Sequence, residues 1–187
     1  DKTEWKNLLL ACKYCNTRKS NKTTSENKND YLWPDENNTE LAYTYAGGIP
    51  RVNSPILLEL DPSGNIAQKA EKLFELVELG NIPAPKDKDR RFKQRIETYA
   101  SARISLRKWK KLKETEYKED SKELIAEIVR SKGFFSVWLE VFKDEPEIKN
   151  MLFDIFPGTE TRFFDADGNV RPILRIEELE AATEAAT

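Results

Sequence analysis

Histidine is absent from the 187 residues of this chain, and cysteine occurs only twice. Without histidine, these residues alone provide no imidazole to act as a general base or as a zinc ligand. Two cysteines, in a chain whose first residues do not resemble a signal peptide, argue against a disulfide framework. The longest apolar runs, such as LLLAC and ILLEL, are far shorter than the ~20 residues of a membrane-spanning helix. We therefore expect a cytoplasmic protein without a membrane partner.

The composition is typical of a globular protein with a dense mixture of charges. Hydrophobic residues make up 39% of the chain, which is enough for one core or two small ones. The net charge of -2 results from 31 basic and 33 acidic residues that are unevenly distributed, so the net charge says little about partners. The chain begins at Asp1 without an initiator methionine, and we expect that an N-terminal part of the natural protein is missing.

The residues before Asn65 predict a loop-rich region with short strands, and those after it predict helices. In the front we expect a strand at 5–11, a helix from Asn16, a polar loop at 20–30, a turn at 31–38, a strand, Gly-Gly turn and second strand at 42–52, and a strand or short apolar segment at 56–60 that ends in a turn at Pro62 and Gly64. In the back we expect helices at 66–77, 92–112, 121–129 and 147–156, a hairpin with an Asp-Gly turn at 162–176, and a short helix or tail at 177–187.

The cysteines stand two residues apart, at Cys12 and Cys15. A tight turn with this spacing lets two thiolates reach one zinc ion at about 2.3 Å, which is half of a tetrahedral site. Carboxylates would have to complete the site from within these residues, and they suit structural zinc poorly. Two ordinary, partly buried cysteines are an alternative. A thioredoxin-like redox pair fits less well, because Lys13 and Tyr14 lie between the cysteines and no βαβ pattern surrounds them.

The neighbouring residues extend the cysteine pair into a longer pattern. Asn7-Leu8 followed by Cys12-x-x-Cys15-Asn16-x-x-Lys19 resembles the second half of the HNH endonuclease motif, in the version where two Cys-x-x-Cys pairs build a zinc knuckle. The resemblance implies that the first cysteine pair and the catalytic histidine lie upstream of Asp1. The absence of this upstream half of the motif would then explain both the missing zinc ligands and the missing histidine.

The resemblance also assigns roles to single residues. Cys12 and Cys15 would be two of four structural zinc ligands, and Asn7 would hold the catalytic histidine in place. Asn16 would coordinate a catalytic Mg²⁺ or Mn²⁺, and Lys19 would contact a phosphate, with Arg18 as a further contact to nucleic acid or a partner. Taken singly, Asn7 is equally well a turn residue and Asn16 a helix N-cap.

A looser similarity covers the rest of the chain. Trp33-Pro34-Asp35 in a loop, followed by a helical region with Lys88-Asp89-Arg90 to Arg95, is similar to the HNH subunit of the Septu anti-phage system. This similarity implies an ABC-type ATPase as a partner. Because that subunit also occurs beside some retrons, a reverse transcriptase with its RNA and DNA is another possible partner.

Basic residues dominate the long predicted helix and its approach. The positive positions are Lys88, Arg90, Arg91, Lys93, Arg95, Arg103, Arg107, Lys108, Lys110, Lys111 and Lys113, against Asp87, Asp89 and Glu97. Such a strip can follow a phosphate backbone, with binding that weakens as salt rises. It can equally be the solvated face of an amphipathic helix or a docking surface for an acidic partner. The candidate binding residues in it are Arg91, Arg95, Arg103, Arg107, Lys108 and Lys111.

Three functions follow from these patterns, and we favour the first. It is a metal-dependent HNH nuclease subunit that hydrolyses phosphodiester bonds of DNA or of an RNA such as tRNA, with the general base upstream of Asp1. The others are a non-catalytic zinc-knuckle module that binds nucleic acid, and a structural adaptor of an ATPase. The expected fold is α+β, with a zinc-stapled ββα nuclease element and loop region at 1–64 and a mainly helical domain at 65–187.

Overall fold

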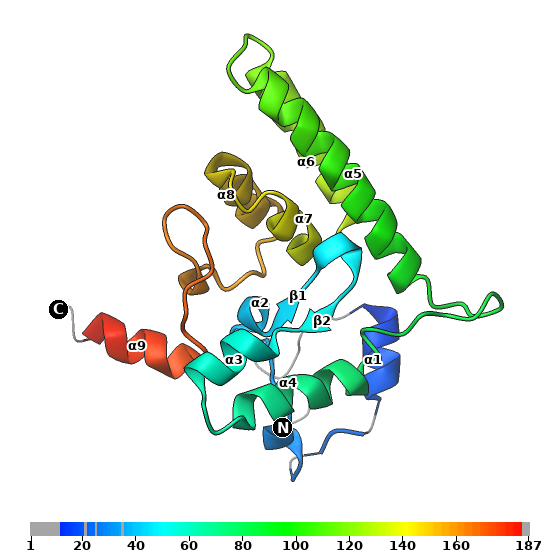
Figure 1. Cartoon of the computed structure of the whole chain (residues 1–187), viewed down its shortest axis with the longest axis vertical. Helices are drawn as coiled ribbons and strands as arrows, with labels where there is room; N and C mark the ends of the chain where they lie inside the picture. Colours follow the sequence, from blue (N-terminus) through cyan, green and yellow to red (C-terminus); the bar gives the residue numbers. More distant parts are fainter. Residues whose placement is uncertain (1–11, 21, 25, 35, 185–187) are drawn as a thin grey trace. The chain divides into compact units, whose positions relative to one another are not determined.

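The computed structural model describes residues 12–20, 22–24, 26–34 and 36–184 (Figure 1). The described part of the chain is mainly helical, and its one sheet has two short antiparallel strands. This confirms the α+β class in its coarse form. The strand expected at 5–11 lies outside the described residues.

The chain divides into two compact units. Unit 1 comprises Asp1–Tyr43, Val52–Asn81 and Ile173–Thr187, and unit 2 comprises Thr44–Arg51 and Ile82–Pro172. Unit 1 therefore contains segments from both sides of residue 64. The helices of the described chain that lie in unit 1 are α1 (Lys13–Lys19), η2 (Lys28–Asp30), α2 (Thr39–Ala42), α3 (Ser54–Leu60), α4 (Asn65–Leu76) and α9 (Ile176–Glu184). Those of unit 2 are η3 (Ala46–Gly48), α5 (Arg91–Leu112), α6 (Lys118–Lys132), α7 (Phe135–Val141), α8 (Pro146–Ile155) and η4 (Thr161–Phe163).

The strand, turn and strand expected at 42–52 are confirmed, although the strands are short. β1 (Tyr43–Thr44) pairs with β2 (Arg51–Val52), and the 3₁₀ turn η3 joins them. The boundary between unit 1 and unit 2 falls within each of these two strands. In unit 2, Gly48 has a φ of 77°, and a Cβ there would lie 2.8 Å from the Arg95 carbonyl oxygen. A glycine is therefore required where η3 packs on α5.

Unit 1 is held together by apolar side chains and by hydrogen bonds to its C-terminal segment. Tyr43 is buried, and its hydroxyl donates to the Ala70 carbonyl in α4 at 2.9 Å. Asn38 is also buried, and its backbone N–H donates to the Leu174 carbonyl at 2.9 Å. The hydrophobic effect and these bonds together fix the segment before α9 beside the loop before α2.

The strand alternative for residues 56–60 is wrong, because these residues belong to helix α3. Pro55 lies in the first turn, where its missing N–H costs nothing and its fixed φ favours the helix. Leu57 is fully buried, whereas Ile56 and Leu58 on either side of it are exposed. A continuous run of apolar residues therefore did not reveal that this segment is a helix of which only a narrow edge is buried. The turn expected at Pro62 and Gly64 is confirmed, and Gly64 has a φ of 75°.

Unit 2 is built on the helical hairpin of α5 and α6, with α7 and α8 packed beside it (Figure 1). The helices predicted at 92–112, 121–129 and 147–156 agree with α5, α6 and α8 to within a few residues, whereas α7 was not predicted. The chain leaves α6 at Gly133, which has a φ of 68° and ends the helix. Trp109, Trp138 and Phe142 are fully buried and form the centre of the core. No helix in the described residues is long and apolar enough to cross a membrane.

The buried face of α5 differs from the apolar stripe that helical spacing predicts, which comprises Phe92, Ile96, Tyr99, Ala102, Leu106, Trp109 and Leu112. Thr98 and Ser105 are buried in this helix, whereas Ile96 from the stripe is 38% exposed and Ile104 is 48% exposed. Arg91 is also buried, and its guanidinium makes an ion pair with Asp89 at 2.7 Å. Because the pair neutralises the arginine, the helix can turn this polar edge inward and leave apolar side chains outside.

The Asp-Gly hairpin is confirmed within its predicted range. Phe164 and Val170 form an antiparallel bridge, and Gly168 occupies the turn with a φ of 69°. Asp165 accepts hydrogen bonds from the backbone N–H groups of Asp167 and Asn169 at 2.9 and 2.8 Å. The side-chain amide of Asn169 and these N–H groups lower the pKa of Asp165.

Candidate metal centre

The two cysteines lie at the beginning of α1. Cys12 has extended backbone angles and caps the helix, and its Sγ accepts the backbone N–H of Cys15 at 3.4 Å. Neither thiol is in a disulfide; Cys12 is exposed and Cys15 is partly exposed. The Cys-x-x-Cys spacing is one with which two thiolates can bind the same metal ion.

Helix α1 begins at Lys13, one turn earlier than the start expected at Asn16. The alternative role of Asn16 as a helix N-cap is wrong, because Cys12 occupies that position. The Asn16 backbone instead belongs to the helix, where its N–H donates to the Cys12 carbonyl at 3.0 Å. The Asn16 side chain is exposed, and the residue directly follows the second cysteine in the sequence. Asn7 lies outside the described residues.

The donor set fits half of a zinc site. Two sulfur ligands from one turn are what a zinc knuckle takes from each of its two chain segments. Between residues 12 and 184, leaving out 21, 25 and 35, no group of three or more His, Cys, Asp or Glu side chains lies in a position to hold a metal. The described residues thus offer two soft ligands, and a closed tetrahedral site needs two more.

Both basic residues at the end of α1 contact other parts of unit 1. The Arg18 Nε lies 3.2 Å from a carboxylate oxygen of Glu78, just after α4. The Lys19 Nζ lies 5.7 Å from the centre of the Trp33 ring, within the range of a cation–π contact. Trp33 is buried, and its indole N–H donates to the Lys28 carbonyl at 2.8 Å. The structure thus brings Lys19 and the Trp33-Pro34 loop together.

No sequence pattern predicted these two contacts. Glu78 lies in a turn after α4 and has the sequence context of an ordinary surface carboxylate, so no local pattern indicates that it is a partner of Arg18. Trp33 stood out as an aromatic residue beside a proline, but its position near α1 depends on the tertiary fold. Both contacts connect the end of α1 to other parts of unit 1.

The predicted basic strip divides into buried and exposed residues. Arg91 and Arg95 are 6% and 3% exposed, and both belong to the inner face of α5. Arg103, Arg107, Lys108 and Lys111 are exposed. Lys113 at the C-terminal end makes an ion pair with Glu145 at 2.9 Å. Among the candidate binding residues, the second group is therefore the one open to a polyanion.

Comparison of the chain with models of protein families, with curated protein sequences and with solved structures gave no match. A functional assignment therefore depends on the residues and geometry described above.

Proposed function

We propose that this chain is the metal-dependent HNH nuclease subunit of an anti-phage defence complex. The observation that supports this best is the position of the Cys-x-x-Cys-Asn-x-x-Lys pattern in the structure. Cys12 caps α1 and its Sγ accepts the backbone N–H of Cys15, and Cys15, Asn16 and Lys19 all belong to this helix. This is the order of residues that the resemblance to the HNH motif implies.

In this proposal, zinc has a structural role. Cys12 and Cys15 supply two ligands, and a second cysteine pair outside these 187 residues supplies the other two. Four thiolates suit zinc, which has no redox chemistry and favours a tetrahedral arrangement. The zinc would fix the start of α1 and with it the direction of the Asn16 side chain.

The chemistry needs a second, hard metal ion and a base. Mg²⁺ or Mn²⁺ stabilises the charge that develops on the phosphate during hydrolysis. The amide oxygen of Asn16 is a suitable ligand for such an ion, and Asn7 would position the histidine that activates water. That histidine comes from outside these residues, because the chain contains none. Alone, the 187 residues are expected to be inactive.

The proposed substrate is DNA or an RNA such as tRNA, and the proposed partner is an ABC-type ATPase. Four exposed cations on α5 (Arg103, Arg107, Lys108 and Lys111) support contact with phosphate groups. In a retron-associated system, a reverse transcriptase with its RNA and DNA would join the complex. We expect the assembly in the cytoplasm, where the ATPase and nucleic acid are available.

A non-catalytic zinc-knuckle module is the second candidate. The absence of histidine from the chain favours it, because binding needs the knuckle and the basic surface but no general base. In that case zinc and nucleic acid would bind, and no cleavage would occur with any divalent metal.

Metal content and cleavage of the natural full-length product test this proposal. We expect about one zinc per chain, and we expect loss of zinc in Cys12→Ser/Cys15→Ser. Asn16→Ala is expected to keep the zinc but lose Mg²⁺- or Mn²⁺-dependent cleavage, since alanine preserves the exposed helix. Lys22→Ser, at an exposed position beyond α1, is the control that should change neither. Zinc binding that survives the double cysteine variant would contradict the proposal, and zinc without cleavage would select the non-catalytic module.

A further inference from the structure

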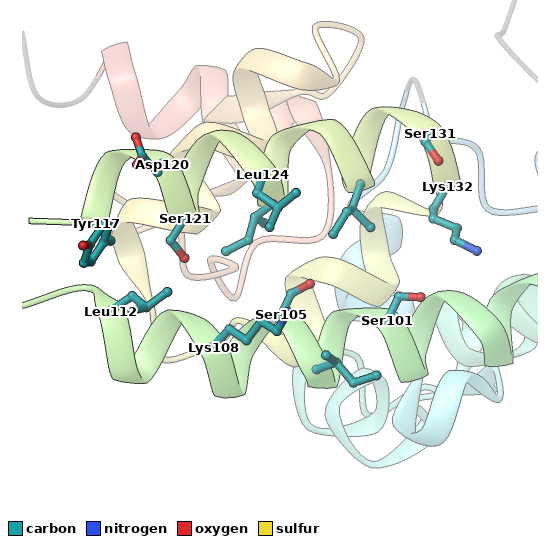
Figure 2. Close-up of a pocket in the computed structure, with 13 residues that line it drawn as sticks. Ser101, Ser105, Lys108, Leu112, Tyr117, Asp120, Ser121, Leu124, Ser131 and Lys132 are labelled. Atoms are coloured by element: carbon teal, nitrogen blue, oxygen red, sulfur yellow. The ribbon is translucent and has the colours of Figure 1, made fainter. Parts of the chain in front are cut away.

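Two features of unit 2 are not part of the proposed nuclease site. The first is an open apolar groove of about 560 Å³ between α5 and α6, whose lining includes Ser101, Leu112, Tyr117 and Leu124 (Figure 2). Nothing in the described residues shows what covers this groove. The second feature is Lys149, a buried lysine on α8 whose amino group contacts the side chain of an asparagine. This second feature brings an amine and a carboxamide together.

The Asp-Gly hairpin covers the side chain of Lys149. The lysine is only 2% exposed. A Cβ on Gly168, in the turn of the hairpin, would lie 2.9 Å from the Lys149 Cβ and 3.4 Å from the Phe153 ring. The Phe153 ring packs on Phe164 at the base of the hairpin, with 4.8 Å between the ring centres. The hairpin therefore holds the lysine side chain in place against α8.

The amino group of Lys149 contacts the side-chain amide of Asn169. Its Nζ donates to Oδ1 of Asn169 at 2.6 Å. Because Oδ1 is bonded to Cγ at about 1.2 Å, Nζ lies within about 3.8 Å of this carbon. Reacting atoms in a near-attack arrangement are about 3–3.5 Å apart. A small rotation of the exposed Asn169 side chain therefore suffices to present Cγ to the amine.

A carboxylate contacts the other end of the same amide. The Nδ2 of Asn169 donates to Oδ2 of Asp165 at 3.0 Å. The second oxygen of Asp165 accepts the backbone N–H groups of Asp167 and Asn169 at 2.9 and 2.8 Å, so the turn fixes the carboxylate. A carboxylate at hydrogen-bond distance from a leaving nitrogen can transfer a proton to it.

We propose that Lys149 and Asn169 form an isopeptide bond within the folded chain, with Asp165 as the proton-transfer group. The neutral Nζ attacks Cγ, a new N–C bond forms, and an electron pair of the C=O bond moves to Oδ1. The attacking nitrogen loses a proton, which passes by way of the Asp165 carboxylate to Nδ2. The C=O bond then re-forms and the Cγ–Nδ2 bond breaks. One ammonia molecule leaves, and the reaction requires no oxidant and no co-reactant.

The protonation of the amine determines how fast this reaction can proceed. Burial lowers the pKa of Lys149, whereas the charges of Asp165, Asp167 and Asp144 favour its ammonium form. Only the neutral amine attacks, so we expect a slow reaction at neutral pH and a faster one as the pH rises towards the pKa of the amine. The structure contains the pair before reaction, and Lys149 titrates in chains that have not yet reacted.

The bond would join α8 covalently to the hairpin that precedes α9. The two residues are 20 positions apart, and a cross-link of this kind stabilises a protein mainly by restricting its unfolded chain. A disulfide cannot have this role in unit 2, because both cysteines of the chain lie in unit 1. The cross-link is independent of the proposed nuclease, since Lys149, Asp165 and Asn169 all lie in unit 2 and outside α1.

The intact mass of the folded full-length protein, followed during incubation, tests the proposal. We expect the mass to fall by about 17 Da, the mass of one ammonia. The loss should be several-fold faster at about pH 9 than at about pH 7, because more of the amine is neutral. Trypsin should release a branched peptide that joins Lys149 to Asn169, which distinguishes the cross-link from a succinimide. An unchanged mass, or a loss of ammonia without the branched peptide, would overturn the proposal.

Variants identify the groups that react. Lys149→Met and Asn169→Ala should each abolish the loss of mass, and Asp165→Asn, which retains both partners and an acceptor in the turn, should slow it about a hundredfold. Asn150→Ala is the matched control: Asn150 donates to the Ala166 carbonyl of the same hairpin at 3.5 Å, and its replacement should leave the loss unchanged. Circular dichroism verifies that each variant is folded. A loss of ammonia that persists in Lys149→Met would overturn the cross-link, and a wild-type rate in Asp165→Asn would overturn the role of Asp165.

Discussion

Trp109 and Glu145 form a buried hydrogen bond that joins α5 to the start of α8. The indole Nε1 of Trp109 donates to Oε2 of Glu145 at 2.8 Å, and the two residues are 1% and 6% exposed. The same carboxylate oxygen accepts from Lys113 Nζ at 2.9 Å. Burial by itself raises the pKa of Glu145, but the hydrogen bonds from Lys113 and Trp109 outweigh it, and the net pKa is lowered. Glu145 is thus a charged residue in the core of unit 2.

Glu145→Ala is expected to lower the free energy of unfolding by about 1–3 kcal/mol, because it leaves the buried indole N–H of Trp109 without an acceptor. Glu147→Ala is the control. Glu147 makes ion pairs with Lys118 and Lys122 at 2.8 and 3.2 Å near the surface, where such pairs contribute at most about 1 kcal/mol. Urea denaturation measures both variants. A greater loss for Glu147→Ala than for Glu145→Ala would contradict this account of the core.

Acid should remove the contribution of the Glu145 charge. Since the pKa in the folded protein lies below the ordinary value of 4.5, the unfolded state binds more protons as the pH falls. The stabilisation is therefore fully present above pH 4.5 and is lost as the pH falls through the folded pKa. Urea denaturation at several pH values should show that the stability advantage of the wild type over Glu145→Gln shrinks below pH 4.5. A constant difference between the two proteins would show that Glu145 does not titrate in this way.

Lys149 predicts a pH dependence on the alkaline side. Its Nζ donates to the Asn169 side chain at 2.6 Å, and it is only 2% exposed. Burial lowers the pKa of Lys149 below 10.5, although the charges of Asp165, Asp167 and Asp144 oppose the shift. Between the folded pKa and 10.5 the unfolded state binds more protons, so stability rises with pH in that window.

The change Lys149→Met removes this titration. Denaturation from pH 7 to pH 10.5 should therefore show the wild type gaining stability relative to Lys149→Met as the pH rises. Lys143→Met is a suitable control, because Lys143 is an exposed lysine in the same unit and its replacement should leave the alkaline gain unchanged. A wild type that loses stability relative to Lys149→Met with rising pH would contradict the prediction.

The sequence predicted those features of the fold that depend on local patterns. Helical spacing predicted α4, α5 and α6, and glycines predicted the turns at Gly64 and Gly168, because periodicity and φ are local properties. The rotation of α5 was not predictable from spacing alone. It depends on the ion pair of Arg91 with Asp89, which makes a polar edge compatible with burial. Apolar letters at 56–60 did not distinguish a strand from a short helix.

In the candidate site, too, features that depend on local sequence were predictable and those that depend on the tertiary fold were not. The spacing of Cys12 and Cys15 predicted a turn, and the structure has one at the start of α1, where the Sγ of Cys12 accepts the backbone N–H of Cys15. The contact of Lys19 with Trp33 could not be predicted, since it joins segments that no sequence pattern connects. Asn7 stays a prediction because it lies outside the described residues.

Because the basic strip contains both buried and exposed residues, we expect substitutions in it to have two different effects. Arg91→Ala is expected to destabilise the protein by about 3 kcal/mol, because it leaves the buried carboxylate of Asp89 without its ion-pair partner. Arg103→Ala removes an exposed side chain and should change the unfolding free energy little. It should instead weaken nucleic-acid binding across sequences and reduce the slope of log affinity against log salt by about 1.

Urea denaturation and binding of a labelled duplex at several salt concentrations distinguish the two effects. Ala100→Ser, an exposed position on α5, should change neither quantity and serves as the control. If Arg103→Ala left the salt slope unchanged while Arg91→Ala altered only binding, the phosphate contacts would lie on the inner edge of α5. The burial of Arg91 against Asp89 would then have to open when nucleic acid binds, at a cost that its ion pair makes large.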